Sequence, residues 1–138
     1  MKQRTFTILK PDTVARRNAG AIIGRLEQEG FEILVARKVK LTEDQARAFY
    51  AVHKERPFYR ALVEFMISGP VWAMALERDD AVAYLRKVMG ATDSTKAEKG
   101  TIRAQFGTNV ERNAIHGSDS PENAAIEISF FFPAAELV

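Results

Sequence analysis

The chain has 138 residues, of which 46% are hydrophobic and 28% are charged, which is ordinary globular usage and excludes a disordered chain. Its 20 Lys and Arg against 18 Asp and Glu leave a formal charge of +2, too small an excess to imply a nucleic-acid partner. No cysteine occurs, so disulfides and thiolate chemistry are excluded. The length fits a single domain over residues 1–138.

The N-terminus runs from Met1 directly into a strand-like segment, without an apolar signal region. No apolar run approaches the ~20 residues needed to cross a bilayer. We therefore expect a soluble, cytoplasmic protein that does not contact a membrane.

The hydrophobic pattern predicts most elements of the chain. Alternation at Phe31, Ile33 and Val35 is typical of a strand, whereas Thr42 to Gln45 form a capping-box pattern that opens a helix. In chain order we predict a strand over 4–9, a helix over 19–29, a strand over 31–39, a helix from 42 to about 53, a helical stretch after Pro57, a nearly continuous apolar strand over 71–76, a helix from 79 to 90, a polar loop over 91–100, a short strand near 110–115 and a helix from Ser120 through Phe131.

This order predicts the fold class. Without the helical insert between the second and third strands, it is the βαββαβ order of the split βαβ motif. The sequence therefore predicts an α+β, ferredoxin-like fold with a four-stranded antiparallel sheet and with helices on one face.

A polar run, Asn113-Ala114-Ile115-His116-Gly117-Ser118-Asp119-Ser120, contains one of only two histidines. Glycine leaves space beside the imidazole, and the hydroxyls and the amide can hold a ring nitrogen or an anion. A neutral imidazole can act near pH 7 as nucleophile, base or ligand. On these eight residues alone, a polar turn that contains a histidine is the simpler interpretation.

Phosphate binding would depend on side chains, because neither glycine-rich phosphate motif occurs and no spacing is typical of zinc ligands. Lys10, Arg86, Thr92 and Arg103 are candidates, since two guanidinium groups and a hydroxyl around one loop suit a polyphosphate. For each arginine alone, solvated surface charge is the simpler interpretation.

The aromatic candidates are ambiguous from spacing alone. Phe58 follows Pro57 and is suited either to stacking on a base at a rim or to core packing. His53 and Tyr50 are equally open, and Phe130 to Phe132 indicate core packing at a helix end.

Six segments in one order resemble the nucleoside diphosphate kinase family, of prokaryotic type, and the resemblance runs from Thr5 to Val138. They are Thr7-Ile8-Leu9-Lys10-Pro11-Asp12, His53-Lys54-Glu55-Arg56-Pro57-Phe58-Tyr59, Ser68-Gly69-Pro70-Val71, Met89-Gly90-Ala91-Thr92, Gly100-Thr101-Ile102-Arg103 and the run that contains His116. The family fold is also ferredoxin-like.

The resemblance implies an enzyme in which His116 takes the γ-phosphoryl group of a nucleoside triphosphate, mainly ATP, and passes it to a nucleoside diphosphate by a ping-pong mechanism. It implies Mg²⁺ that enters with the nucleotide phosphates, without a metal site on the protein. The remaining implied residues are Lys10, Tyr50, Arg103 and Asn113 around the sugar and the γ-phosphate, His53, Arg86 and Thr92 at the α and β phosphates, Phe58, Leu62 and Val110 at the base, and Ser118 and Glu127 as groups that orient His116.

The resemblance also implies a homo-oligomer, with a hexamer favoured over a tetramer. Ser94 and Lys99 stand where most members carry proline, so loop rigidity and assembly are expected to differ. Two other functions remain open: an RNA-binding module, whose aromatic-basic strand pattern is missing here, and a family member without catalysis, which the intact His116 argues against. No specific nucleic-acid partner is expected.

Overall fold

The computed structural model describes residues 1–137; Val138, the last residue of the predicted domain, lies outside the described residues. Four strands form one sheet: β1 (Lys2–Leu9), β2 (Glu32–Val39), β3 (Val71–Asp79) and β4 (Ile115–Gly117). The helices are α1 (Pro11–Ala15), α2 (Ala19–Gln28), α3 (Glu43–Phe49), α4 (Tyr59–Met66), α5 (Ala81–Met89), α6 (Ile102–Phe106) and α7 (Pro121–Phe131), with short 3₁₀ turns η1 (Ala51–His53), η2 (Ser94–Lys96) and η3 (Ala134–Glu136).

The sheet has the order β2-β3-β1-β4, and every neighbouring pair is antiparallel. β1 is central: it pairs with β3 along its whole length, and Ile8 lies opposite His116 on β4. The helical insert, α3 to α4, separates β2 from β3. The predicted ferredoxin-like fold is confirmed.

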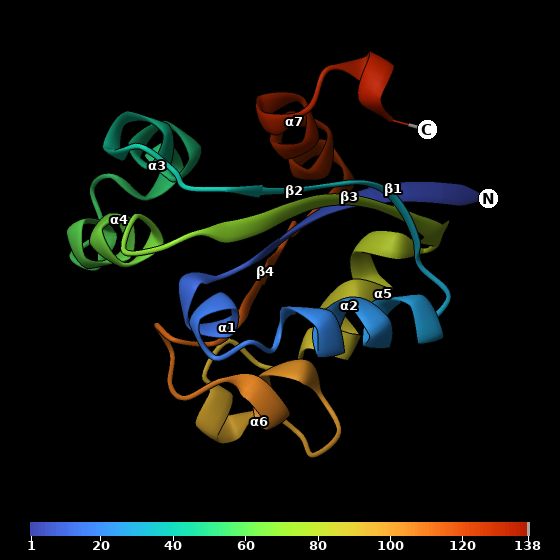
Figure 1. Cartoon of the computed structure of the whole chain (residues 1–138), viewed down its shortest axis with the longest axis horizontal. Helices are drawn as coiled ribbons and strands as arrows, with labels where there is room; N and C mark the ends of the chain where they lie inside the picture. Colours follow the sequence, from blue (N-terminus) through green and yellow to red (C-terminus); the bar gives the residue numbers. More distant parts are fainter. Residues whose placement is uncertain (138) are drawn as a thin grey trace.

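Helices cover both faces of the sheet, and the expectation that they lie on one face is wrong. Figure 1 shows α7 on one side of the sheet and α2 and α5 on the other. Phe6 and Ile8 of β1 pack in one core cluster with Ile128 of α7, whereas Leu9 packs in a second cluster with Leu26 of α2. Both faces of β1 are apolar or buried, which is why helices are stabilised against each.

The central strand β1 therefore presents no exposed aromatic side chain. Phe6, the aromatic residue of β1, is 0% exposed because it packs beneath α7 and beside Phe131. The RNA-binding interpretation needs exposed strand aromatics on a free sheet face, and β1 does not provide one.

The predicted capping box is confirmed at the start of α3. The Thr42 hydroxyl accepts from the Gln45 backbone N–H at 3.1 Å, and the Gln45 side chain accepts from the Thr42 N–H at 2.9 Å. The helix ends at Phe49, and η1 continues the turn to His53. This arrangement carries Tyr50 and His53 toward the end of the sheet where β4 begins.

The last strand and two short helices differ from the prediction. The last strand spans Ile115–Gly117 rather than 110–115, because the Asn109 side chain accepts from the backbone N–H groups of Glu111 and Arg112 and folds that segment into a turn. His116 thus lies in a strand. The short helices α1 and α6 were not predicted, since five residues contain no helical period.

None of the helices formed by residues 1–137 is both long and apolar enough to span a membrane.

Candidate functional site

His116 is held by its strand and by one carboxylate. β4 fixes its backbone against β1, and the Thr7 hydroxyl donates to the His116 carbonyl at 2.7 Å. The ring Nε2 lies 2.9 Å from Glu127 Oε1 on α7, and the side chain is 21% exposed. An ionised carboxylate only accepts hydrogen bonds, so Nε2 carries the hydrogen and Nδ1 keeps its lone pair.

Ser118 fixes the carboxylate in turn. Its hydroxyl donates to the same Glu127 Oε1 at 2.7 Å, and its backbone N–H donates to the Phe6 carbonyl at 3.1 Å. The α7 helix that carries Glu127 begins at Pro121 and is capped by Ser120, whose hydroxyl accepts from the Asn123 N–H. Ser118 and Glu127, the two residues expected to orient His116, are therefore hydrogen-bonded to each other, and Glu127 in turn contacts the imidazole.

Aromatic rings surround the imidazole. Phe6, Phe49 and Tyr50 place their centroids 6.3, 5.5 and 6.2 Å from that of His116, all edge-on. Phe49 was not singled out from the sequence, since one aromatic residue in a helix is typical of core packing. These contacts restrict rotation of the ring and leave a defined direction for Nδ1.

Two buried cations lie beside the strand that carries His116. Lys10 and Arg103 are 7% and 6% exposed. Burial, followed by the positive charge of Arg103, lowers the pKa of Lys10 to about 8. Burial, followed by the charge of Arg86, lowers the pKa of Arg103 to about 10. Desolvated cations that repel one another favour an anionic partner, as a polyphosphate would be.

The cations are held mostly by neutral groups. Lys10 Nζ donates to Asn113 Oδ1 at 2.8 Å, and Arg103 donates to the carbonyls of Ile115 and Gly90 at 2.8 and 3.1 Å. Arg86 reaches the Gly117 carbonyl at 3.3 Å. Because these partners aim the cations without neutralising them, their charge stays available to a ligand. The surface-charge interpretation of Arg103 is wrong, since this guanidinium is buried.

Asn113 joins the cations to the loop that follows α5. Its side-chain amide donates to the carbonyls of Thr92 and Val110 at 3.0 and 3.1 Å while its oxygen accepts from Lys10. Asn113 is 2% exposed, so this amide is a structural junction. Thr92 and Val110 join it through their backbones, and the side chain of Val110 is 58% exposed.

A row of three aromatic rings, Tyr50, His53 and Phe58, leads from the buried side of the site to the surface. The ring centroids of Tyr50 and His53 are 6.5 Å apart, and those of His53 and Phe58 are 5.4 Å apart. Phe58 is 49% exposed, so its core-packing interpretation is wrong, whereas Leu62 packs partly against the core. The Tyr50 hydroxyl is buried without a partner in the described residues, and burial raises its pKa.

The predicted site residues thus fall into two groups. His116, Glu127, Ser118 and Tyr50 form one, and Lys10, Arg103, Asn113, Arg86 and the Thr92 backbone form the other. His53 adjoins the first group through Tyr50, and Phe58 lies next to His53. Leu62 packs against the core cluster that includes Tyr50, whereas the Val110 side chain is exposed. The sequence missed Asp12 and Thr13, which bind the backbone of Ala114; the signal was Pro11, a residue favoured in the first turn of a helix.

The charges of the site bear on metal binding. Residues 1–137 contain no cluster of three or more His, Asp or Glu side chains that could hold a metal ion. The carboxylate at the imidazole, Glu127, is already bonded to His116 and Ser118. The other charged groups named for the site, Lys10, Arg86 and Arg103, are cations, which do not bind a metal ion. The donor set therefore fits a metal ion that is carried by an anionic ligand.

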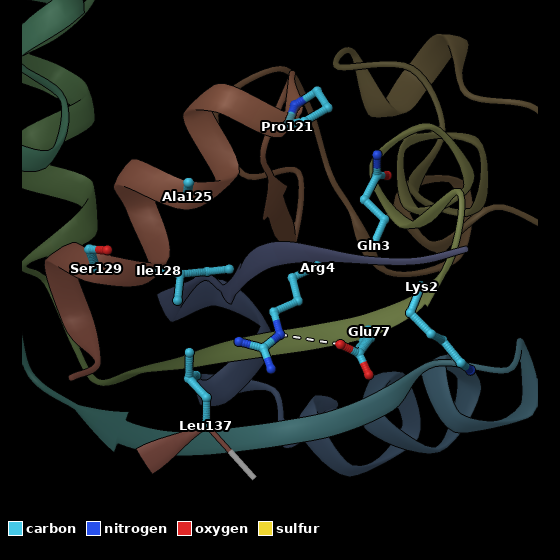
Figure 2. Close-up of a pocket in the computed structure, with 9 residues that line it drawn as sticks. All are labelled: Lys2, Gln3, Arg4, Glu77, Pro121, Ala125, Ile128, Ser129 and Leu137. Carbon is cyan, nitrogen blue, oxygen red and sulfur yellow. Dashed lines mark hydrogen bonds and ion pairs between the residues drawn. The ribbon is translucent and has the colours of Figure 1, made fainter. Parts of the chain in front are cut away.

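A separate hollow lies away from the His116 site. It lies between the start of β1 and α7, and the Arg4–Glu77 ion pair is among its lining residues (Figure 2). Its volume is ≈ 480 Å³, and the two charged groups are 3.2 Å apart. None of the described residues that line it is a predicted site residue. It is wide open, and its charged side chains are already paired or solvated, so it does not compete with the His116 site.

The family model for nucleoside diphosphate kinase matches residues 3–137. A nucleoside diphosphate kinase of Thiobacillus denitrificans is 53% identical over 135 residues, which is 98% of this chain and 95% of the relative. One of Persephonella marina is 51% identical over 136 residues, with 99% and 97% covered.

Solved structures agree with this match. The Aquifex aeolicus nucleoside diphosphate kinase superposes with a TM-score of 0.97 at 48% identity, with all of both chains covered. The Halobacterium salinarum enzyme, solved in complex with CDP, gives 0.96 at 41% identity and covers 100% of this chain and 92% of its own. With a family model over nearly the whole sequence and a superposition of this quality, the chain belongs to the nucleoside diphosphate kinase family.

Proposed function

We propose that this chain transfers the γ-phosphoryl group of a nucleoside triphosphate, mainly ATP, to nucleoside diphosphates through a phosphohistidine on His116. The observation that carries the assignment to His116 is its hydrogen bond to Glu127, 2.9 Å long, in a strand whose Ile115 carbonyl accepts from the buried Arg103. The carboxylate holds the proton on Nε2, so Nδ1 is the nitrogen that can attack phosphorus.

The reaction consists of two similar half-reactions. The Nδ1 lone pair attacks the γ-phosphorus, and the bond from phosphorus to the bridging oxygen breaks, with its electrons leaving on the nucleoside diphosphate. In the second half-reaction, a terminal oxygen of another diphosphate attacks, and the P–N bond breaks. One phosphoanhydride replaces another, so the equilibrium is close to unity and the kinetics are ping-pong.

The cations supply the electrostatic stabilisation of this transfer. Lys10 and Arg103 lie beside the strand of His116, where charge develops on the oxygens of the transferring group. Arg86 and Thr92, with His53, are proposed at the α and β phosphates. Buried cations act strongly here because little water screens them.

Members of this family use a divalent cation, and we propose that this ion is Mg²⁺ and that it enters with the nucleotide. It neutralises phosphate charge when bound. The proposed base site consists of Phe58, Leu62 and Val110; the exposed face of Phe58 suits stacking, which does not distinguish one base from another. We therefore expect broad nucleotide specificity.

We also propose that residues 1–138 form one catalytic domain, which the family match over 3–137 supports, and that the chain assembles as a homo-oligomer, with a hexamer favoured over a tetramer. Ser94, which stands in place of a proline, is 7% exposed and donates to the Asn109 carbonyl at 3.2 Å. This bond gives the loop an anchor that proline could not supply.

Sedimentation of the purified protein distinguishes a hexamer from a tetramer.

His116→Ala is the direct test of the assignment. It should abolish transfer from ATP to GDP, because no other nucleophile is proposed, while circular dichroism and thermal unfolding remain close to wild type. Added imidazole should restore some turnover of ATP by occupying the vacated position. Full activity of the variant would refute the assignment.

A further inference from the structure

Ala114 has a backbone conformation that alanine rarely adopts. Its φ is 76°, in the left-handed region, and the residue is 0% exposed. The Cβ atom disfavours this conformation, so neighbouring groups must hold it in place. Ala114 lies between Asn113 and β4, and thus between the two groups of site residues.

Both polar backbone groups of Ala114 are held by the segment 10–13. Its N–H donates to Asp12 Oδ2 at 3.2 Å. Its carbonyl accepts from the Lys10 backbone N–H and from the Thr13 hydroxyl, each at 2.9 Å. Asp12 and Thr13 are 7% and 1% exposed, so water does not compete for these bonds.

The conformation at Ala114 sets the direction in which its two neighbours point. On one side, Asn113 accepts from Lys10 Nζ and ties it to the loop at Thr92. On the other side, Ile115 and His116 enter β4 and pair with Leu9 and Ile8. A rotation at Ala114 would therefore move Asn113 relative to His116.

The Asp12 carboxylate also has an electrostatic effect. Its Oδ1 is buried with no hydrogen-bond partner in the described part of the chain. Three charged groups act on Lys10: Arg103 lowers its pKa, and Asp12 and Glu111 raise it. Asp12 therefore opposes the loss of the Lys10 proton that burial promotes.

We propose that Asp12 is a positioning residue of the phosphoryl-transfer site, whose carboxylate, helped by the Thr13 hydroxyl, holds Ala114 in the left-handed conformation that keeps Asn113 and Lys10 in register with His116. The inference rests on the proposed function, since it names the residue that aligns that site. Asp12 acts through the backbone and through Lys10, without contact to His116.

The first test compares rates of phosphoenzyme formation at saturating ATP by rapid quench. Asp12→Ala should slow this step about tenfold or more, because small displacements of reacting groups cost large factors in rate. The additional change Ala114→Gly should recover part of the loss, since glycine adopts positive φ freely. No recovery in the double variant would contradict action through this backbone.

Because Asp12→Ala could reduce activity simply by misfolding, two threonine variants provide an independent test. Thr13→Val removes the hydroxyl that binds Ala114, whereas Thr5→Val removes an equally buried hydroxyl that has no partner in the described residues. Thr13→Val should slow phosphoenzyme formation severalfold, and Thr5→Val should leave it unchanged. Both rates are taken on protein shown to be folded by circular dichroism.

The second test is a pH profile of kcat/KM. Asp12→Asn keeps an oxygen that can accept from Ala114 but removes the charge, so the alkaline limb should move to lower pH as Lys10 loses its proton earlier. Asp44→Asn, an exposed charge change on α3, should leave the limb in place. A merely structural role for Asp12 predicts no such shift.

The outcomes separate this inference from the proposed function. If wild type forms phosphoenzyme normally but the Asp12 and Thr13 variants match Thr5→Val in rate and Asp44→Asn in pH profile, the positioning role is wrong. If wild type itself forms no phosphoenzyme, the proposed function fails first.

Discussion

Glu127 Oε1 accepts hydrogen bonds from both His116 and Ser118, so one carboxylate oxygen sets the tautomer of the imidazole. Glu127→Gln removes the charge and offers an amide that can donate to Nε2, which favours the hydrogen on Nδ1 and blocks attack. We expect phosphoenzyme formation to slow by at least about tenfold, with ADP affinity little changed. Rapid quench and calorimetry measure the two quantities. Glu122→Gln, exposed on the same helix, is the control, and equal rates in both variants would contradict this role.

Lys10 gives the site a dependence on pH. Its pKa is lowered to about 8 from 10.5, so the free protein loses this charge as pH rises through 8, while the unfolded chain keeps it until 10.5. Between these values the unfolded state binds more protons, so this group's contribution to the free energy of unfolding rises with pH. A bound polyphosphate reverses the shift by favouring the charged form.

Nucleotide binding near pH 8.5 should therefore take up protons, and affinity should fall as pH increases through 8. Calorimetry of ADP binding in buffers of different ionisation enthalpy measures the uptake. Lys10→Arg should abolish the uptake, because a guanidinium stays protonated. Equal apparent enthalpies in all buffers for wild type would contradict the lowered pKa.

At the scale of elements, β4 packs against α5 at Gly117. A Cβ atom there would lie 2.5 Å from Met89 Sδ and 3.1 Å from Leu85 Cδ2. Gly117→Ala should lower the free energy of unfolding by about 1–3 kcal/mol and reduce transfer, because the buried Met89 side chain or the strand that carries His116 must shift. Gly24→Ala in α2, where nothing lies within 4 Å, should instead stabilise by about 0.5–1 kcal/mol with transfer unchanged. Denaturant unfolding compares them, and equal stabilities would contradict the packing at β4.

The same elements show what the sequence can predict. The amphipathic helices α2 and α5 and the alternating strand β2 have clear periods, β3 was marked by its nearly continuous apolar run, and the capping box at Thr42 marked α3. α1 and α6 have five residues each, too few for a period, although Pro11 stands in the first turn of α1, where proline is favoured. The cover on both sheet faces follows from tertiary packing, which alternation in β1 alone does not determine.

The residues of the site could be predicted from the sequence, but the backbone conformation that holds them could not. His116, Glu127 and the cations were named through the resemblance, and the structure supplies their hydrogen bonds and burial. The positive φ of Ala114 could not be predicted, because alanine carries no signal for that conformation and its cause lies a hundred residues away, at Asp12 and Thr13. Long-range contacts of this kind become visible only in the folded chain.

In the whole molecule, each face of the sheet packs against its own hydrophobic core cluster. One core cluster joins β1 to α3, α4 and α7, and the other joins it to α2 and α5. Glu127 reaches His116 from the first side and Arg86 reaches Gly117 from the second. The site thus lies where both halves of the core meet the short strand β4, so its geometry depends on the complete fold.

The central claim is that His116 carries the phosphoryl group between nucleotides. The most direct measurement mixes the protein with γ-labelled ATP and Mg²⁺, isolates the chain, and follows the label after GDP is added. We expect label that is stable in base and labile in acid, maps to His116 and moves to GTP. Absence of label on a folded protein that still binds nucleotide would contradict the account, as would label on any other residue.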